Sequence, residues 1–516
     1  MHRHDQMLKT KYRLLKNFLT LLQGCLFVKN SSVSTDEDFI CSDDIRHDFS
    51  MAMSAMYQDE VPLYGDLVDL VSEVNAEVLT SHPDVKSQLL HTGEIERLSM
   101  ERHGAIRLGT AAELSMMRRL FAVMGMYPVG YYDLAPAGVP VHSTAFRALD
   151  SHSLHKSPFR VFTSLLRLDL IADDTLQQEA SATLAQRQIF TAGVIELIEI
   201  FEVQGGLTSE QAQQFVQEAL ETFRWHDKTP VAKALYQRLL DQHPLVADVV
   251  GFKGPHINHL TPRTLDIDAV QQGMQARGIP SKAIIEGPPR RAYPILLRQT
   301  SFKALQEAVG FKVVNASDGA KEEYEQGHHT ARFGEIEQRG VALTPKGRAL
   351  YDELLAAARR QLGATPNEDN AAQYNQILAE VFIAFPDDYQ TLHNEGLAYF
   401  YYQLTDSTLD SEDGQALLAT TLSTDDLNKV PNAKLSALIN DEVLRIEPIV
   451  YEDFLPVSAA GIFQSNLKQA QPSQYDGRSS QQSFERDLGA AIHDEMALYE
   501  AMQAQSLEQC LSSVSV

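Results

Sequence analysis

Arg102-His103-Gly104-Ala105-Ile106-Arg107 and Asn258-His259-Leu260-Thr261-Pro262-Arg263 carry the same phrase, His-x-x-x-Arg. The glycine of the first copy and the proline of the second disfavour a helix, and each copy is followed by a segment that reads as one. In a strand, positions i and i+4 face the same side, so the histidine and the arginine of each copy point together. The phrase therefore predicts two matching strands that open two related units.

A third extended segment, Phe333-Gly334-Glu335-Ile336-Glu337-Gln338-Arg339, supplies carboxylates. Two imidazoles and one carboxylate make the facial ligand set that suits non-haem Fe(II) and leaves positions open for substrate and dioxygen. His103, His259 and one glutamate therefore predict an oxygenase. Glu335 and Glu337 share a face of the strand, so spacing alone leaves either as the ligand.

Arg107 is the candidate for binding the far end of a substrate. At roughly 3.3 Å per residue, its Cα lies about 13 Å from that of His103. A long arginine side chain that leans back would bring its guanidinium within several ångströms of a metal on His103. This spacing suits a short dicarboxylic acid with one end on the metal and the other paired bidentately with arginine.

The composition bounds the class of protein. The 516 residues carry a net charge of −25, and 44% of them are hydrophobic. Such a chain buries two or three core-forming units, and its charge opposes binding to nucleic acid or an anionic membrane. Its three cysteines, Cys25, Cys41 and Cys510, form no Cys-x-x-Cys pair, which favours a reducing cytoplasm over a disulfide or thiolate–zinc framework.

The pattern predicts an α+β fold with two βαβββ units that form a partly open barrel around a metal, surrounded by helical segments. Extended segments are expected at 283–287, 293–302 and 330–343, and a helical stretch from Thr163 to Trp225 separates the units. The expected divisions are 1–42 for a poorly ordered extension, 43–100 for a helical segment, 101–150 for the first unit, 151–250 for a helical insertion, 251–345 for the second unit with the metal site, 346–445 for a helical cover, and 446–516 for a substrate-pocket segment with a final helix near 485–505.

The repeated order around a His, His, Glu site resembles the vicinal oxygen chelate superfamily. A closer resemblance is to the 2-oxoadipate dioxygenase/decarboxylase family, the D-2-hydroxyglutarate synthases, and it runs from about Asp43 to Leu498. It rests on the segments already quoted, and on 256–268, Glu286-Gly-Pro-Pro-Arg-Arg291, 332–340 and Tyr451-Glu-Asp-Phe-Leu-Pro-Val-Ser-Ala-Ala-Gly-Ile-Phe-Gln-Ser-Asn466.

This resemblance implies Fe(II) bound by His103, His259 and Glu335, with the substrate-selecting arginine at Arg107 and a main-chain group near Val457 completing the pocket. It favours Glu335 over Glu337, which would pair instead with an arginine such as Arg339 or Arg332. The implied reaction converts 2-oxoadipate and dioxygen to 2-hydroxyglutarate and carbon dioxide, a step of lysine catabolism.

The sequence suggests further residues near the site. Ser458 has no nucleophile-elbow glycines around it and is expected in a substrate-contacting loop. Arg290 either lines the pocket mouth or lies in a solvated turn. His256 would face away from His259 in a strand and is expected outside the ligand set.

Other function classes stay open. His, His, Glu sites also serve zinc hydrolases and metal-dependent isomerases, which need no dioxygen. A non-catalytic scaffold would bind no stoichiometric metal. The expected partners are a 2-oxo dicarboxylic acid and dioxygen, without nucleic acid or membrane.

Overall fold

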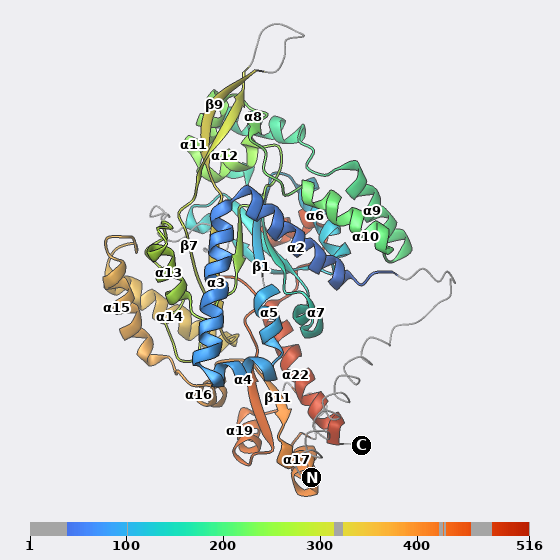
Figure 1. The fold of residues 1–516 in the computed structure, drawn as a ribbon, viewed down its shortest axis with the longest axis vertical. Helices are drawn as coiled ribbons and strands as arrows, with labels where there is room; N and C mark the ends of the chain where they lie inside the picture. The colour runs from blue at the N-terminus through green and yellow to red at the C-terminus, as the bar shows by residue number, and fades with distance from the viewer. Residues whose placement is uncertain are drawn as a thin grey trace. The chain divides into compact units, whose positions relative to one another are not determined.

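The computed structural model describes residues 39–100, 102–313, 323–422, 427, 430–455 and 477–514. A seven-stranded sheet lies at its centre, and helices surround the sheet (Figure 1). In sheet order the strands are β2 (Tyr127–Asp133), β3 (Val141–Arg147), β4 (Arg160–Leu166), β1 (Arg102–Leu108), β6 (His259–Pro262), β10 (Phe333–Arg339) and β7 (Leu297–Ser301).

The sheet is built from two related halves, as the sequence predicts. In the first half, β1, α6 (Ala111–Val123), β2, β3 and β4 follow in βαβββ order, and β1 pairs with β4 in parallel. In the second half, β6 and α13 (Ile267–Ala276) come first, and β6 pairs with β10 in parallel. The halves meet where β1 and β6 run antiparallel. The first strands of both units therefore lie side by side at the centre of the sheet.

Strand β4 corrects the sequence analysis, which expected a helical stretch from Thr163. All seven residues of β4 are buried, because the strand lies between β3 and β1 and helices cover the sheet. A short apolar run buried on both faces shows no alternation, so its periodicity does not separate strand from helix. The first βαβββ unit therefore ends at Leu166.

The structure confirms some of the other expected strands and helices and corrects others. The expected strands at 293–302 and 330–343 are β7 and β10, whereas 283–287 contributes only a bridge from Glu286 to Gln299. The expected cover at 346–445 also contains a strand, β11 (Phe400–Leu404). The expected final helix is two helices, α21 (Gly477–Leu488) and α22 (Glu495–Val514), separated at Gly489, whose φ of +74° favours glycine.

Helices α2 (Ser42–Glu60) and α3 (Pro62–Ser81) fix the strands that carry the candidate ligands. The hydroxyl of Tyr57 in α2 lies 3.0 Å from the carbonyl of Asn258 and 2.9 Å from that of Phe333. In α3, the side chain of Asn75 donates to the carbonyl of Arg263 and accepts from the amide of Leu265. Side chains from two helices thus satisfy the backbone where β6 and β10 begin and where β6 ends.

Two smaller sheets lie away from the centre (Figure 1). Strands β8 (Gln306–Lys312) and β9 (Tyr324–Thr330) form a hairpin between β7 and β10 in the chain, and β5 (Lys228–Thr229) joins it. Strand β12 (Leu444–Pro448) pairs with β11. The remaining helices are α4 (Pro83–His91), α5 (Glu94–Met100), α7 (Ser151–Lys156), α8 (Asp174–Ala185), α9 (Ala192–Gln204), α10 (Ser209–Glu221), α11 (Lys233–Gln242), α12 (Pro244–Gly251), α14 (Pro345–Leu362), α15 (Ala371–Val381), α16 (Tyr389–Asn394), α17 (Asp406–Leu409), α18 (Glu412–Thr421) and α19 (Asn432–Asn440).

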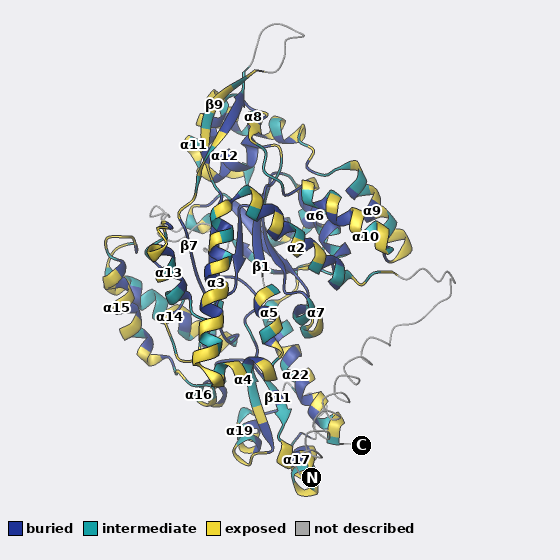
Figure 2. Cartoon of the chain, viewed as in Figure 1, coloured by how far each residue is buried: buried dark blue, intermediate teal, exposed yellow. Residues whose placement is uncertain are grey.

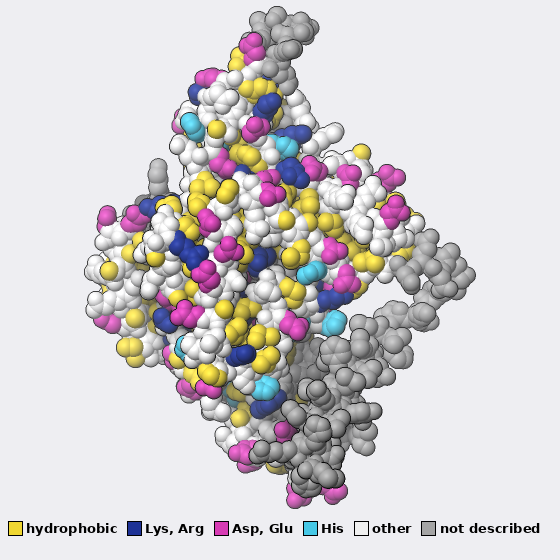
Figure 3. Space-filling model, viewed as in Figure 1, with side chains coloured by type: hydrophobic (Ala, Val, Ile, Leu, Met, Phe, Trp, Pro, Cys, Tyr) yellow, Lys and Arg dark blue, Asp and Glu magenta, His cyan; other side chains and the backbone are white. Residues whose placement is uncertain are grey.

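The central strands are buried, while helices such as α3, α9 and α10 show one exposed face (Figure 2). On the face drawn in Figure 3, basic side chains are interspersed with acidic ones rather than gathered. Among the described residues, no helix combines the length and the apolar character needed to cross a membrane.

Arg147 of β3 gives a stability prediction. Its buried guanidinium binds both carboxylate oxygens of the buried Asp453, at 2.7 and 2.9 Å. Arg147→Met should lower the free energy of unfolding by about 3–5 kcal/mol, because it leaves a carboxylate buried without its counter-charge. Urea denaturation measures this loss. Arg238→Met, which breaks a half-exposed pair with Glu179, should cost less than about 1 kcal/mol; equal losses would contradict the assignment.

Candidate metal centre

His103, His259 and Glu335 converge at the centre of the sheet. Their strands β1, β6 and β10 are neighbours, and all three side chains are fully buried. His103 Nε2 lies 3.7 Å from Glu335 Oε1, and His259 Nε2 lies 3.6 Å from Glu335 Oε2. One donor atom from each residue can be chosen so that all three lie within 4.8 Å of one another. The structure thus brings together the three residues that the sequence analysis selected as ligands.

The donor atoms fit a divalent metal ion. Among the described residues, His103 Nε2, His259 Nε2 and Glu335 Oε2 are buried without a hydrogen-bond partner. Leaving such atoms unsatisfied is costly, and a metal ion bound among them would satisfy all three. Burial and the neighbouring His103 hold the pKa of His259 well below its usual value, which favours the neutral imidazole that binds metals.

Glu337 lies on the other side of His103. Its Oε2 is 2.8 Å from His103 Nδ1, and its carboxylate also binds Arg339 at 2.9 and 2.8 Å. Burial opposes charge on His103, but Glu337 and Glu335 outweigh it and raise the pKa of this histidine. A carboxylate on Nδ1 holds the ring in the tautomer that presents Nε2 to a metal. The predicted pairing of Glu337 with an arginine is present.

Two aromatic rings, an amide and a lysine also surround the ligands. The ring of Phe333 stacks on His259 with centroids 4.9 Å apart, and Phe454 meets His103 edge-on, also at 4.9 Å. Gln299 of β7 donates to Glu335. Burial lowers the pKa of Lys282 to about 8, against the opposing effect of Glu286 and Glu335. The sequence analysis did not select Gln299 or Lys282; Gln299 lies in the expected strand 293–302, which the structure pairs with the ligand strand β10.

The arginines of the two His-x-x-x-Arg phrases have different partners. Arg107 Nη1 lies 2.7 Å from Asp248 Oδ2, and its positive charge contributes to the low pKa of His259. Arg263 Nη1 binds Glu94 at 2.6 Å. The charge of Arg107 therefore influences the ligand His259, whereas Arg263 is part of a buried ion-pair network with Glu94.

The other predicted substrate residues lie in different settings. Arg290 is 68% exposed and pairs with Asp266, a placement that corresponds to the solvated turn rather than the pocket mouth. Val457 and Ser458 lie outside the described residues. The chain that leads to them is described as far as Leu455, and Phe454 reaches the ring of His103.

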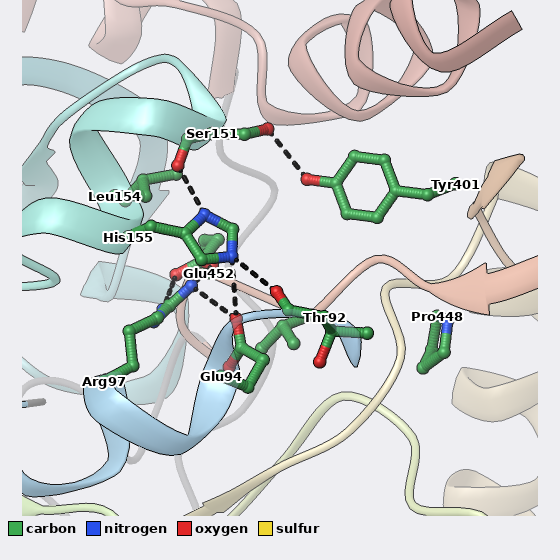
Figure 4. Close-up of a pocket in the computed structure, with 10 residues that line it drawn as sticks. Thr92, Glu94, Arg97, Ser151, Leu154, His155, Tyr401, Pro448 and Glu452 are labelled. Carbon is green, nitrogen blue, oxygen red and sulfur yellow. Dashed lines mark hydrogen bonds and ion pairs between the residues drawn. The ribbon is translucent and has the colours of Figure 1, made fainter. Parts of the chain in front are cut away.

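Ion pairs of Glu452 and Asp453 fix the chain segment that leads to Phe454 and the metal centre. Glu452 accepts two hydrogen bonds from Arg97, at 2.9 and 3.0 Å, and a third from Arg160. A small polar pocket lies against this cluster, and Figure 4 shows Arg97, Glu94 and Glu452 on one side of it, with His155 bonded to the carbonyl of Thr92. The buried ion pairs hold Glu452 and Asp453 against β3 and β4.

A sequence model of the family described as 2-oxoadipate dioxygenase/decarboxylase matches residues 49–466. The chain belongs to this family. A 2-oxoadipate dioxygenase/decarboxylase of Pseudomonas putida is 55% identical over 479 residues, which cover 93% of this chain and 98% of that one. The Escherichia coli relative of the same name is 52% identical over 471 residues, 91% of this chain and 98% of its own.

Solved structures give the same result. The hydroxyglutarate synthase from Pseudomonas putida, in a crystal structure with 2-oxoadipate, superimposes with a TM-score of 0.81 at 55% identity, covering 93% of this chain and all of that one. A Shigella flexneri structure matches with a TM-score of 0.77 at 48% identity and covers 91% of this chain. The predicted family and fold are therefore confirmed.

The contact between Glu337 and His103 gives a prediction about metal affinity. Glu337→Gln should weaken metal binding by roughly 10- to 100-fold, because the neutral amide no longer supports the imidazole as a carboxylate does. Titration with Fe(II) against a competing chelator measures the change. Glu307→Gln, which weakens a different arginine pair at Arg332, should leave the affinity unchanged. Equal affinities for the wild type and Glu337→Gln would refute this role.

Proposed function

We propose that this protein converts 2-oxoadipate and dioxygen to 2-hydroxyglutarate and carbon dioxide at an Fe(II) ion held by His103, His259 and Glu335. The observation that carries the proposal is the buried set of two imidazoles and one carboxylate in a member of this family. Two histidines and one carboxylate suit non-haem Fe(II), whereas structural zinc sites are commonly closed by four protein ligands.

The chemistry balances within one substrate. 2-Oxoadipic acid and 2-hydroxyglutaric acid contain the same numbers of hydrogen and oxygen atoms and differ by a single carbon, so the dioxygen consumed balances the carbon dioxide released. One oxygen atom accounts for oxidative decarboxylation of the 2-oxo acid and the other for hydroxylation of the shortened product, so no second oxo acid is consumed. When bound, the iron supplies a chelation site for the 2-oxo acid and activates dioxygen.

The residues of the chain have distinct roles in this proposal. His103, His259 and Glu335 would hold the ion, and a set of three protein ligands would leave coordination positions for substrate and dioxygen. Glu337 keeps the proton of His103 on Nδ1. The aromatic rings of Phe333 and Phe454 restrict water around the ligands. Exclusion of water strengthens the electrostatic interactions of the site.

Arg107 and the segment after Leu455 would recognise the substrate's distal carboxylate. A guanidinium presents several N–H groups in a plane that matches a carboxylate, which suits Arg107 for this task. The main chain at Val457 and the hydroxyl of Ser458 are proposed as further contacts, since Phe454 already reaches the metal centre. The relative solved with 2-oxoadipate supports a diacid of this length. We place the activity in the cytoplasm, in lysine catabolism.

Oxygen uptake by Fe(II)-loaded protein tests the proposal, with products identified by mass spectrometry. With 2-oxoadipate we expect one O2 consumed per 2-hydroxyglutarate formed, and much slower uptake with 2-oxoglutarate or 4-hydroxyphenylpyruvate. Absence of uptake with any of the three acids, despite stoichiometric iron, would refute the dioxygenase. Hydrolytic or isomerase substrates would then be the ones to test.

A further inference from the structure

A second buried cluster lies beside Arg107. It consists of Asp248 in α12, His256 in the loop before β6 and His329 in β9, and all three are buried. Asp248 Oδ1 is 3.0 Å from His329 Nε2 and 3.3 Å from His256 Nε2, while its Oδ2 faces Arg107. One carboxylate therefore connects two imidazoles to the proposed substrate arginine.

Of the two imidazoles in this cluster, His329 is hydrogen-bonded at both nitrogens, whereas His256 Nε2 has no hydrogen-bond partner among the described residues. His329 Nε2 bonds to Asp248 at 3.0 Å, and His329 Nδ1 lies 2.7 Å from the hydroxyl of Tyr236. At the metal centre, His103 Nε2 and His259 Nε2 lie 3.7 and 3.6 Å from carboxylate oxygens of Glu335, and neither nitrogen has a hydrogen bond among the described residues. Asp248 also already has a cation, Arg107, on its second oxygen. These contacts give Asp248 and His329 partners within the protein, as in a hydrogen-bond network.

Aromatic rings and a second arginine fix the network in place. Trp225 packs edge-on against His256, with centroids 4.7 Å apart, and stacks on His329 at 6.1 Å. At the end of α12, Arg187 donates to the carbonyl of Val249 and binds both oxygens of Glu113. Asp248 therefore has little freedom to follow Arg107, and Arg107 must adopt the direction that Asp248 sets.

We propose that Asp248 is a positioning residue, which directs the guanidinium of Arg107 toward the distal carboxylate of the substrate. The side chains of Arg107 and Asp248 are only 10% and 6% exposed, so their attraction is weakly screened. A guanidinium has five N–H groups, so the bond from Nη1 to Asp248 is compatible with a second carboxylate. The proposal rests on the proposed function, and it makes Asp248 a determinant of selectivity for diacids.

A double-mutant cycle tests this role. Asp248→Ala should lower kcat/KM for 2-oxoadipate by roughly 10²-fold, because a misplaced binding group loses the alignment of the reacting carbon. In an Arg107→Ala background the same change should have almost no further effect. Binding of 2-oxohexanoate, measured as a substrate or competitive inhibitor, should be unchanged, since that acid has a methyl group in place of the distal carboxylate.

Asp43→Asn is the matched control. It breaks another arginine–carboxylate pair of low exposure, between Asp43 and Arg46 in α2, and should lower the melting temperature without changing the preference for 2-oxoadipate over 2-oxohexanoate. Iron content should stay at one equivalent in Asp248→Ala. A loss of iron in that variant would overturn the proposal in favour of a metal-binding cluster.

Two kinetic outcomes would also overturn it. One is an active wild type whose kcat/KM is unchanged by Asp248→Ala. The other is an equal effect of Asp248→Ala with and without Arg107, which would mean that Asp248 acts through the fold rather than through the arginine. Failure of the proposed function is distinct from both, because the wild type itself would then consume no oxygen with 2-oxoadipate.

Discussion

His259→Ala is expected to remove the bound iron and to reduce oxygen uptake with 2-oxoadipate by at least about 10³-fold, because metal catalysis contributes several kcal/mol to the transition state. Only Glu335 and His103 would remain as ligands. Iron per chain, measured by elemental mass spectrometry, and oxygen-electrode rates give two independent readouts.

A buried histidine elsewhere separates loss of the metal from loss of the fold. His393 is also buried, and its Nε2 lies 2.9 Å from the hydroxyl of Tyr402, in a region that carries none of the proposed ligands. His393→Ala should reduce stability but retain one equivalent of iron. Full iron content and activity in His259→Ala would exclude this histidine from the ligand set.

Arg107→Lys should lower kcat/KM for 2-oxoadipate by roughly 10²-fold while iron content stays constant. Lysine keeps the charge but not the planar fork, and a charged hydrogen bond contributes about 1.5–3 kcal/mol, where 1.4 kcal/mol is a factor of ten. Steady-state oxygen uptake at varied 2-oxoadipate measures the change.

Arg290→Lys provides the comparison, since the sequence analysis selected both arginines. The exposed setting of Arg290 predicts less than a twofold change. A large loss of kcat/KM in Arg290→Lys would instead indicate that Arg290 lines the pocket mouth. An unchanged kcat/KM in Arg107→Lys would remove Arg107 from substrate recognition.

The three proposed ligands could be selected from sequence because each lies on a short, regular strand. Residues on a strand have fixed sidedness, so the repeated phrase selected His103 and His259, and the structure brings both beside Glu335. The choice between Glu335 and Glu337 could not come from spacing, because both face the same side. The structure separates them: Glu335 faces both Nε2 atoms, and Glu337 faces Nδ1 of His103.

Residues that act across long sequence distances were not predictable in this way. Asp248 meets Arg107 across 141 residues and His329 across 81, and it lies within the expected helical insertion 151–250, to which the sequence analysis gave no role in the site. Strand β4 was missed for a related reason: its burial on both faces comes from neighbours that the local sequence does not contain. In each case tertiary packing, rather than local periodicity, decides the role.

The antiparallel junction of β1 and β6 makes the metal a bridge between the repeats. Because the proposed donors come from β1 on one side and from β6 and β10 on the other, neither repeat alone carries a complete site. The free energy of metal binding is then available only to a chain whose two halves are folded and paired. Iron binding would thereby stabilise the two paired repeats together, beyond what the hydrogen bonds between β1 and β6 contribute.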